Sequence, residues 1–485
     1  MSVTTTRTAS TAPRRFRLDS AAGRLTPAER TARGKEARAA VPRSSHAAFD
    51  PQPDRPDPIT LLDEQAESRL RELVPVRYGR MSSSPFAYFR GAALPMASDL
   101  ATTPVSGLAV QACGDAHLSN FGLFGSAERN LVFDLNDFDE TLPGPWEWDV
   151  KRLAASLEIA GRENGYSRKQ RRAIVTAGTA KYRTSMREFA TMTNLAVWYA
   201  RADVERIRAE HAGEVTGKQR RRFDKAVAKA RTSDSIKALS KLARMEQGRL
   251  KILSDPPLIV PFTELLDDQD LEAFKAQLLG LLAGYRRTLS SDRRFLMEQF
   301  EFQDMARKVV GVGSVGTRAW IILFQGHSGS DPLFLQVKEA QESVLSRFCG
   351  AGPYRNQGQR VVSGQRLMQA SSDIFLGWQH VESGIDGQAR DFYVRQLKDW
   401  KFSFEASSAR PSSMRIYAEL CGWTLARAHA RSGDRIAIGA YLGGSDTFEN
   451  AITEFAEAYA DQNERDHAAL VDAIGSGRVR AERDV

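Results

Sequence analysis

Residues 309–324 carry the feature that most restricts the fold of this chain. Gly311, Gly313 and Gly316 form a Gly-x-Gly-x-x-Gly pattern that runs directly into Ala-Trp-Ile-Ile-Leu-Phe at 319–324. In a dinucleotide-binding βαβ unit the same pattern opens a helix. Aromatic and branched residues directly after the glycines instead predict two strands joined by a glycine turn, which argues against a Rossmann unit.

The next apolar segment, 332–340, predicts a third strand and carries Lys338. Backbone amides of a glycine hairpin can lie over phosphate groups, and a lysine on the next strand can neutralise α- and β-phosphate charge. The three glycines and Lys338 are therefore candidate nucleotide-binding residues, with Glu342 or Glu339 as a candidate partner of Lys338. A surface hairpin with a lysine at its strand end is the alternative.

A second polar segment runs from Cys113-Gly114-Asp115 to Asn120. In phosphoryl transfer, an Asp on a tight loop can accept the proton of an attacking hydroxyl, while an Asn five residues later helps to hold Mg²⁺. Asp115 is thus a candidate catalytic base and Asn120 a candidate metal ligand. His117 is a further candidate, either contacting a phosphate or acceptor, or holding the loop by a hydrogen bond.

Acidic residues cluster at 134–140, directly after the apolar strand candidate 131–133. Hard cations prefer oxygen ligands, so Asp134, Asp137 and Asp139 are candidates for bridging a metal to nucleotide phosphates. The alternative is a solvated acidic loop. Asp149 opens a predicted helix, where we expect it to cap that helix or to hold the loop at 113–120 through backbone hydrogen bonds.

The net charge of +8 is unevenly distributed along the 485 residues. Residues 1–45 carry a surplus of +7 and residues 218–251 a surplus of +9, so the remainder sums to −8. The second segment has a single aromatic residue, Phe223, and therefore no base-stacking surface. We expect a solvated helical hairpin there, or a guide for an anionic acceptor. Nucleic acid is not the expected partner.

Composition and pattern divide the chain into four expected parts of an α+β protein. Residues 1–57 are expected to be mostly a disordered basic tail, and 58–304 to hold the catalytic loop and a largely helical region. Residues 305–400 are expected to be β-rich, and 401–485 helical. No membrane span is predicted, and three distant cysteines do not form a disulfide framework, which favours the cytoplasm.

The two polar segments together resemble the protein-kinase-like fold, especially its aminoglycoside-phosphotransferase branch. There, a His-Gly-Asp-x-x-x-x-Asn loop precedes a strand that ends in a metal-binding Asp, and a later Asp opens a helix. Cys113 replaces the His here. Asp134-Leu135-Asn136 replaces the usual Asp-Phe-Gly, which leaves open whether Asp134 or Asp137 is the main metal ligand.

A closer resemblance is to a bacterial family, the domain of unknown function 2252, and it covers nearly the whole chain after about residue 30. That family name implies no substrate. The segments that carry the resemblance are Arg77-Tyr-Gly-Arg-Met81, Phe89-Arg-Gly-Ala92, Gly114-Asp-Ala-His-Leu-Ser-Asn-Phe-Gly122, Asp137-Phe-Asp-Glu140 and Tyr393-Val-Arg-Gln-Leu-Lys-Asp399.

The order of the kinase-like elements differs from the usual one. The glycine turn and Lys338 follow the catalytic loop by about two hundred residues, although they normally precede it. Beginning the chain at residue 305 and joining its ends restores the usual order. The resemblance thus implies a circularly permuted, two-lobed kinase-like fold with a large helical insertion, in which Lys338 lies near Asp134.

This resemblance implies an ATP- and Mg²⁺-dependent phosphotransferase that acts on a hydroxyl of an unidentified small molecule or protein. One alternative is a pseudokinase, a nucleotide-binding regulatory module, because both signature loops are altered. Another is a metal-dependent phosphodiesterase that uses the acids at 134–140 and His117. The phosphodiesterase would leave the glycine turn and Lys338 without a role.

Overall fold

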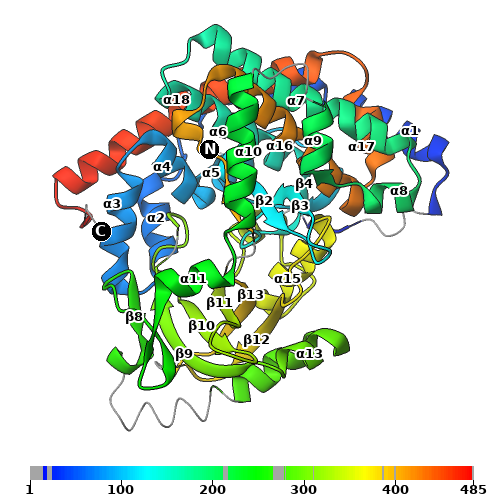
Figure 1. Ribbon diagram of the computed structural model, residues 1–485. Helices are drawn as coiled ribbons and strands as arrows, with labels where there is room; N and C mark the ends of the chain where they lie inside the picture. Colours follow the sequence, from blue (N-terminus) through cyan, green and yellow to red (C-terminus); the bar gives the residue numbers. More distant parts are fainter. Residues whose placement is uncertain are drawn as a thin grey trace, which may run out of the picture.

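The computed structural model describes residues 15–18, 24–210, 217–265, 278, 280–309, 311–384, 387–397 and 400–482. These residues form a mixed α+β fold, with a six-stranded antiparallel sheet at the bottom of Figure 1 and a body of packed helices above it. Among the described helices, none is both long enough and apolar enough to cross a membrane.

The six-stranded sheet has the order β12-β13-β11-β10-β9-β8. Strands β9 and β10 flank the glycine segment, and β11 follows as the third strand, as the sequence predicts. The hairpin and its neighbours pair antiparallel throughout. The bounds are β8 (Ile259–Pro261), β9 (Glu301–Lys308), β10 (Ala319–Gln325), β11 (Pro332–Ala340), β12 (Gly377–Val381) and β13 (Arg390–Gln396).

Alternate side chains of these strands enter different apolar clusters, because successive strand residues point to opposite faces. Ile322 and Leu335 belong to the cluster that contains Tyr285, whereas Ile321 and Leu323 pack with residues of β6 and β7. Burial on both faces explains the nearly continuous apolar runs in β10 and β11. Figure 1 shows α11 (Ser235–Leu242), α13 (Ser291–Met297) and α15 (Gln357–Met368) beside this sheet, and the short helix α14 (Ser346–Cys349) contacts β4.

The helical body is built around the close approach of two long helices, α7 and α16. A Cβ atom on Gly422 of α16 would lie 2.1 Å from the backbone oxygen of Gly178 on α7, so the crossing requires glycine. Trp146 stacks on Tyr182 with centroids 5.7 Å apart and is fully buried, so it is a packing residue of this body. The main helices of this body are α6 (Trp146–Glu163), α7 (Arg168–Thr191), α16 (Pro411–Ser432), α17 (Arg435–Leu442) and α18 (Thr447–Gly475).

Two small sheets lie between the helical body and the large sheet. One pairs β1 with β4, and the other has the order β14-β2-β3-β5. The segment Pro143-Gly144-Pro145 belongs to β4, because β1 supplies its pairing partner. The bounds are β1 (Ala109–Ala112), β2 (Phe121–Gly125), β3 (Leu131–Leu135), β4 (Leu142–Pro145), β5 (Ala202–Asp203) and β14 (Phe402–Ser403).

The N-terminal region differs from the expected tail. Helix α1 (Pro27–Ala40) packs against α17, where Arg30 pairs with Asp434 at 2.8 Å. His46 is fully buried and lies 2.7 Å from the hydroxyl of Tyr441. A polar helix without a strong apolar stripe is ordered here by ion pairs and tertiary contacts. Residues 1–14 and 19–23 of the expected tail lie outside the described residues.

The segment 58–100 forms short helices. These are α2 (Pro58–Ala66), α3 (Val74–Met81), α4 (Pro85–Gly91) and α5 (Ala93–Leu100), and a 3₁₀ turn (Arg71–Leu73) lies between the first two. Proline occupies an early position in the first three, where its missing N–H costs no hydrogen bond. These helices lie beside both the glycine turn and the catalytic-loop candidate.

The expected largely helical region within 58–304 also contains strands in its second half. After α8 (Asn194–Tyr199), α9 (Val204–Glu210) and α10 (Gly217–Arg231), the chain forms a β-hairpin from β6 (Ala243–Glu246) and β7 (Arg249–Ile252). The basic segment 218–251 is thus helices followed by a hairpin, because Leu250 and Ile252 alternate into the core beneath β9.

Candidate functional site

A pocket with a volume of about 150 Å³ lies between the glycine turn and the loop 113–120. It is lined by candidates from both segments, which lie about two hundred residues apart in sequence. Gly316 and Asp134 do not line the pocket. Lys338 lies next to the pocket, in contact with the lining residue Asp139. The candidates that line it are Asp115, His117, Asn120, Asp137, Asp139, Gly311, Gly313, Glu339 and Glu342.

The loop 113–120 is anchored by the first turn of α6. The carboxylate of Asp149 accepts hydrogen bonds from the backbone N–H groups of Cys113 at 2.6 Å and Gly114 at 2.9 Å. Its Oδ2 atom also lies 3.0 Å from Nε2 of His429 on α16. Asp149 is 1% exposed, so these contacts are shielded from water. It thus holds the loop, which was one of the two roles expected from the sequence.

Gly114 is required by the geometry of this loop. Its φ is +83°, in the left-handed region that residues with a Cβ rarely adopt. A Cβ atom here would lie 2.4 Å from the backbone oxygen of Glu140. The loop and the acidic segment 137–140 therefore approach each other closely because residue 114 has no side chain.

The carboxylate of Asp115 is 21% exposed and points to the pocket, but it is also ion-paired. Its Oδ1 atom lies 2.7 Å from the guanidinium of Arg152, which reaches across from α6. Asn120 donates from Nδ2 to the backbone oxygen of Asp115 at 2.7 Å. This bond fixes the amide and leaves Oδ1 of Asn120 as the atom suited to a metal.

His117 is buried beside Asp115 and is neutral in this environment. Its Nδ1 atom accepts a hydrogen bond from the N–H of Ser119 at 3.2 Å, while Nε2 lies 3.8 Å from Oδ2 of Asp115. Burial lowers the pKa of His117 to about 3, in spite of the nearby carboxylate of Asp115. It therefore holds the loop and cannot act as a positively charged phosphate ligand at neutral pH.

Lys338 joins the large sheet to the acidic segment. Its Nζ atom lies 2.7 Å from Oδ2 of Asp139 and 4.0 Å from Oδ1 of Asp137. The hydroxyl of Tyr393 on β13 donates to the other oxygen of Asp139 at 2.6 Å. Burial lowers the pKa of Lys338, but the two carboxylates raise it more, so the net pKa lies above its ordinary value.

Asp137 is the acid best placed to serve a ligand. Its side chain is 32% exposed at the pocket. Burial raises the pKa of this carboxyl, but the positive charges of Lys338 and Arg395 lower it by more. The net pKa therefore lies below the ordinary value. Asp137 is therefore ionised at neutral pH. Its distance to Lys338 is 4.0 Å, longer than the 2.7 Å between Lys338 and Asp139.

The structure does not bring Asp134 to the pocket. Its side chain is 1% exposed and forms an ion pair with Arg427 of α16. It also accepts hydrogen bonds from the backbone N–H of Ala370 at 2.8 Å and of Leu135 at 2.9 Å. Asp134 thus connects β3 to α16 and to the chain after α15, whereas Asp137 and Asp139 lie with Lys338.

The expected partner of Lys338 after β11 is not the one observed. Glu342 lines the pocket from the loop after β11, and Lys338 pairs with Asp139 instead. Glu339 also lines the pocket, but its carboxylate pairs with Arg318 at 3.3 Å and Arg390 at 3.4 Å. The next long helix, α15, contains no acidic residue. Its Arg360 instead donates to the backbone oxygens of Asp139 and Thr141.

Residues between 69 and 80, which precede the catalytic-loop candidate, hold the glycine turn in place. Arg80 donates to the backbone oxygen of Gly311 at 2.7 Å, and Arg69 to that of Val315 at 2.5 Å. The N–H of Leu70 donates to the oxygen of Gly316 at 2.8 Å. Gly316 has a φ of +88°, which favours glycine at this tight turn. Tertiary contacts thus fix the turn above the pocket.

Sequence reasoning missed three residues of this site. Arg90 of α4 lines the pocket, and its Nε atom is buried without a hydrogen-bond partner. Arg152 and Tyr393 hold Asp115 and Asp139. Arg90 and Tyr393 lie inside segments that carried the family resemblance, but neither residue was assigned a role from the sequence. Lys398 and Asp399, at the end of one such segment, lie outside the described residues.

Within the described part of the chain, no group of three or more His, Cys, Asp and Glu side chains is arranged to hold a metal ion. The three described cysteines are buried and free, as expected. Mg²⁺ usually takes only one or two carboxylates together with phosphates and water. Asp137 and Asn120 could supply the few protein ligands that such a site needs, with phosphates and water as the others. A metal site made only of protein ligands does not fit these residues.

Comparison with known proteins gives one match. Neither a curated protein nor a solved structure matches the chain. A family model described as an uncharacterised protein conserved in bacteria (DUF2252) matches residues 69–473. That range includes the catalytic-loop candidate, the acidic segment, the glycine turn and the helices around them. The chain therefore belongs to the DUF2252 family of bacterial proteins.

Proposed function

We propose that this protein is an ATP- and Mg²⁺-dependent phosphotransferase with a circularly permuted, kinase-like arrangement. The observation that carries the proposal is the single pocket formed by the glycine turn and the Asp115–Asn120 loop. Phosphoryl transfer requires phosphate-binding amides, a lysine, a metal-binding carboxylate and a base within one pocket. Here the glycine turn, Asp137 and Asp115 line one pocket, and Lys338 adjoins it through Asp139.

Each residue has a role in this proposal. Backbone amides near Gly311 and Gly313 bind phosphate oxygens, and Lys338 provides positive charge beside them. Asn120 and Asp137 hold Mg²⁺, which would offset the charge of the β- and γ-phosphates. Asp115 orients the acceptor hydroxyl and accepts its proton. Asp139 positions Lys338, since it bonds both that lysine and Tyr393.

The order of the elements supports the permutation. The hairpin β9–β10, strand β11 with Lys338, helix α15 and strands β12 and β13 follow one another along the chain. After them comes α16, whose Arg427 and His429 contact Asp134 and Asp149 beside the catalytic loop. Joined to the chain start, α16 would lead into that loop, then to β2, β3 and α6. This is the order expected of a kinase-like protein.

Nucleotide binding provides the first test. We expect Mg·ATP to raise the melting temperature of the full chain, because a ligand that binds only the folded state stabilises it. The shift should be larger with Mg²⁺ than with EDTA. A chain that shows no shift at millimolar Mg·ATP does not have the proposed function. If binding is seen, transfer of the γ-phosphate should then be screened with libraries of hydroxyl acceptors.

Replacement of the base provides the second test. Asp115→Ala should lower phosphoryl transfer by roughly 10²–10⁴-fold, the usual contribution of a general base. Affinity for Mg·ATP should stay nearly unchanged, since Asp115 contacts the acceptor and not the nucleotide. Transfer is measured with labelled ATP and binding by calorimetry. Equal losses in both would contradict the role of Asp115.

A nucleotide-binding regulatory module is the second candidate. It is favoured by the ion pair between Arg152 and Asp115, because this contact occupies one oxygen of the carboxylate that would have to accept the proton. This candidate predicts the same Mg·ATP-dependent melting shift without turnover. Measurement of ATP consumption in the presence of acceptors separates the two functions.

A further inference from the structure

The pocket between the glycine turn and the loop 113–120, called the small pocket below, has a polar lining. Its volume is about 150 Å³, below the roughly 300–1,000 Å³ of sites that enclose a complete drug-sized ligand. Its described lining residues include no Phe, Tyr or Trp, and apart from glycines the apolar ones are Ala93, Val312 and Val344. Such a lining suits phosphate groups and offers little surface on which a nucleobase could stack.

The lysine beside the small pocket has its charge already offset. Nζ of Lys338 lies 2.7 Å from Oδ2 of Asp139 and 4.0 Å from Oδ1 of Asp137. The side chain of Lys338 is 3% exposed, so bulk water and salt screen these contacts little. Phosphates at the glycine turn therefore gain most from a cation that has no carboxylate partner.

Arg69 is such a cation. It lies between α2 and the 3₁₀ turn Arg71–Leu73, is 6% exposed and lines the small pocket. Its Nη1 atom donates to the backbone oxygen of Val315 in the glycine turn at 2.5 Å, whereas its Nε atom is buried without a hydrogen-bond partner. Within the described part of the chain, no carboxylate forms an ion pair with Arg69.

The two acids whose charges act on Arg69 have other partners. These acids are Glu140 and Glu339, and both line the small pocket. Glu339 pairs with Arg318 at 3.3 Å and with Arg390 at 3.4 Å. Glu140 accepts a backbone N–H at 2.7 Å, and burial raises the pKa of its carboxyl to about 7. Glu140 is therefore partly protonated at neutral pH and offsets the charge of Arg69 only in part.

A second buried guanidinium adds to the positive charge at Arg69. Arg77 is fully buried and donates from Nη2 to Oε1 of Gln65 at 2.7 Å and to the backbone oxygen of Gly91 at 3.0 Å. Its Nε and Nη1 atoms are buried without partners. Burial lowers the pKa of Arg69, and the like charge of Arg77 lowers it further. A bound anion would stabilise both cations, because a buried charge without a counter-charge is costly.

We propose that the small pocket recognises its phosphate donor by the oligophosphate group, through Arg69 and the backbone of the glycine turn, and not by the nucleobase. This inference rests on the proposed phosphotransferase function and names its donor class, which is nucleoside triphosphates of any base together with inorganic tripolyphosphate. Guanidinium groups form strong, charge-assisted hydrogen bonds with phosphate oxygens, and Nε of Arg69 is available for one.

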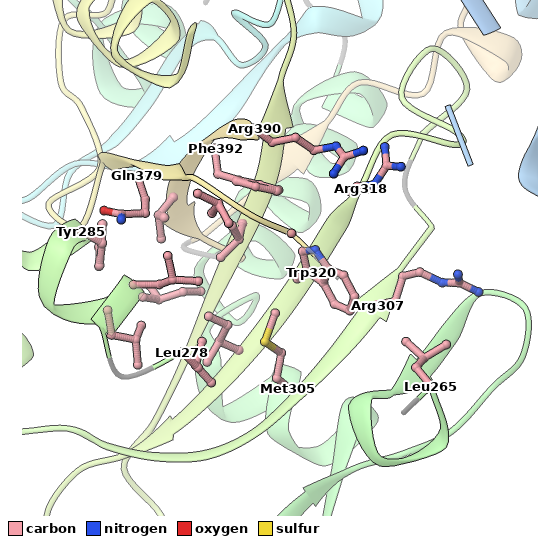
Figure 2. Close-up of a pocket in the computed structure, with 18 of the residues that line it drawn as sticks. Leu265, Leu278, Tyr285, Met305, Arg307, Arg318, Trp320, Gln379, Arg390 and Phe392 are labelled. Carbon is pink, nitrogen blue, oxygen red and sulfur yellow. The ribbon is translucent and has the colours of Figure 1, made fainter. Parts of the chain in front are cut away.

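Aromatic rings that could hold a base lie in a larger pocket, with a volume of about 300 Å³. Figure 2 shows Trp320 and Phe392 among its lining residues. Arg318 and Arg390 also line it, and both pair with Glu339, which lines the small pocket. The two pockets therefore adjoin at these ion pairs. A base bound in the larger pocket would contact Trp320, and tryptophan fluorescence detects that mode of binding.

Calorimetry on the full chain with the Mg²⁺ complexes of ATP, GTP and tripolyphosphate tests the donor class. We expect the three dissociation constants to lie within about fivefold of one another, a difference of less than about 1 kcal/mol, and adenosine not to bind. Mg·ATP that binds more than about fivefold more tightly than Mg·tripolyphosphate would overturn the proposal. A fluorescence change with ATP that is absent with tripolyphosphate, and that Trp320→Phe removes, would place the base in the larger pocket and overturn it as well.

Variants of Arg69 test the residue that carries the proposal. Arg69→Gln should weaken all three ligands about tenfold, as expected for the loss of one charge-assisted hydrogen bond, and Arg69→Lys should recover part of that loss. Arg80→Gln is the matched control, because Arg80 donates to the backbone oxygen of Gly311 in the same turn but does not line the pocket. Equal losses in the two Gln variants would show that Arg69 only holds the turn, and would overturn its role.

These outcomes are distinct from those that test the proposed function. Binding of all three ligands without phosphate transfer to any acceptor would remove the phosphotransferase function and keep this recognition of the donor. Transfer from ATP that GTP does not support would overturn the donor class and keep the phosphotransferase. A chain that binds none of the three ligands has neither property.

Discussion

The charged residues of the small pocket differ in how completely they are paired. Asp139 bonds both Lys338 and Tyr393, and Asp115 is paired with Arg152. The Nε atom of Arg90 is buried without a hydrogen-bond partner, and Asp115 is the nearby charge that favours its protonated form. Burial nevertheless leaves the pKa of Arg90 below its ordinary value. A phosphoryl group in the pocket would supply the missing partner.

Arg90→Gln should therefore lower phosphoryl transfer by roughly 10²–10³-fold, the usual effect of removing one donor that stabilises transition-state charge. The KM for ATP should change much less than kcat. Steady-state kinetics with saturating acceptor measures both. Arg80→Gln is a useful comparison, because Arg80 bonds the backbone of Gly311 and should affect KM more than kcat. An unchanged kcat in Arg90→Gln would contradict this role.

A buried lysine in α6 predicts a pH dependence of stability. Burial lowers the pKa of Lys151 to about 7 from 10.5, although Glu147 raises it. Between these values the unfolded chain binds more protons than the folded chain, so stability rises with pH. The slope is at most about 1.4 kcal/mol for each pH unit. Glu147 and His46 titrate at about 6 and about 3, below this window.

Lys151→Met should remove this rise and leave a flatter profile. Its Nζ atom has no hydrogen-bond partner and lies 4.7 Å from the ring centroid of Phe455, so a methionine can fill the same apolar space. Urea denaturation at about pH 7, 8 and 9 gives the free energies of unfolding. The same slope in the variant and in the wild type would show that other groups cause the dependence.

At the scale of elements, the position of α6 depends on its neighbours. Asp149 in its first turn fixes the catalytic-loop candidate, and α7 and α16 pack beside it. The backbones of α7 and α16 meet where Gly178 faces Gly422. His429 of α16 bonds both Asp149 of α6 and Tyr182 of α7. The geometry of the loop thus depends on how closely these helices pack.

Gly422→Ala should destabilise the fold by about 1–3 kcal/mol, the usual cost of overpacking a close contact. The added Cβ would lie 2.1 Å from the oxygen of Gly178, so the helices must separate. Gly475→Ala at the end of α18 is the control, because nothing lies within 4 Å of its added Cβ. The control should be neutral or slightly stabilising. Urea midpoints measure both, and equal values would contradict the close crossing.

At the scale of the whole molecule, the small pocket unites segments that are distant in sequence. The contact between Lys338 and Asp139 joins residues 199 positions apart. Arg69 and Arg80 hold a glycine turn that lies more than two hundred residues further along the chain. Nucleotide bound between the glycine turn and the catalytic-loop candidate should therefore affect both parts together.

Hydrogen exchange with mass spectrometry checks this expectation. Mg·ATP should slow amide exchange in the peptides that cover 113–122 and 311–318 in parallel, with the same concentration dependence. Peptides from the β6–β7 hairpin should show no change, because this hairpin does not line the pocket. Protection by Mg²⁺ alone, confined to 134–140, would instead support the phosphodiesterase alternative.

Local sequence patterns were sufficient for the elements next to the candidate site. The glycines followed by an apolar run predicted the β9–β10 hairpin and the strand with Lys338, and both are present. The spacing from Asp115 to Asn120 identified a loop that the structure places at the pocket. Such features depend on neighbouring residues, so they can be read from sequence.

Elements that depend on distant partners were missed. Pro143-Gly144-Pro145 becomes a strand because β1 pairs with it, and α1 is ordered because α17 and Asp434 contact it. The β6–β7 hairpin is fixed by burial of Leu250 and Ile252 beneath the large sheet. In each case tertiary contacts outweigh a weak local preference.

The sequence by itself determined which residue types could serve phosphate and metal chemistry, and that they occur in two separate segments. Only the tertiary structure decided which acid faces the pocket. Asp134 and Asp137 are the same residue type and cannot be told apart in the sequence. In the structure, Arg427 pairs with Asp134 and Lys338 lies beside Asp137. The physical reason is that pairing and burial of a charge are set by residues far along the chain, which spacing alone does not specify.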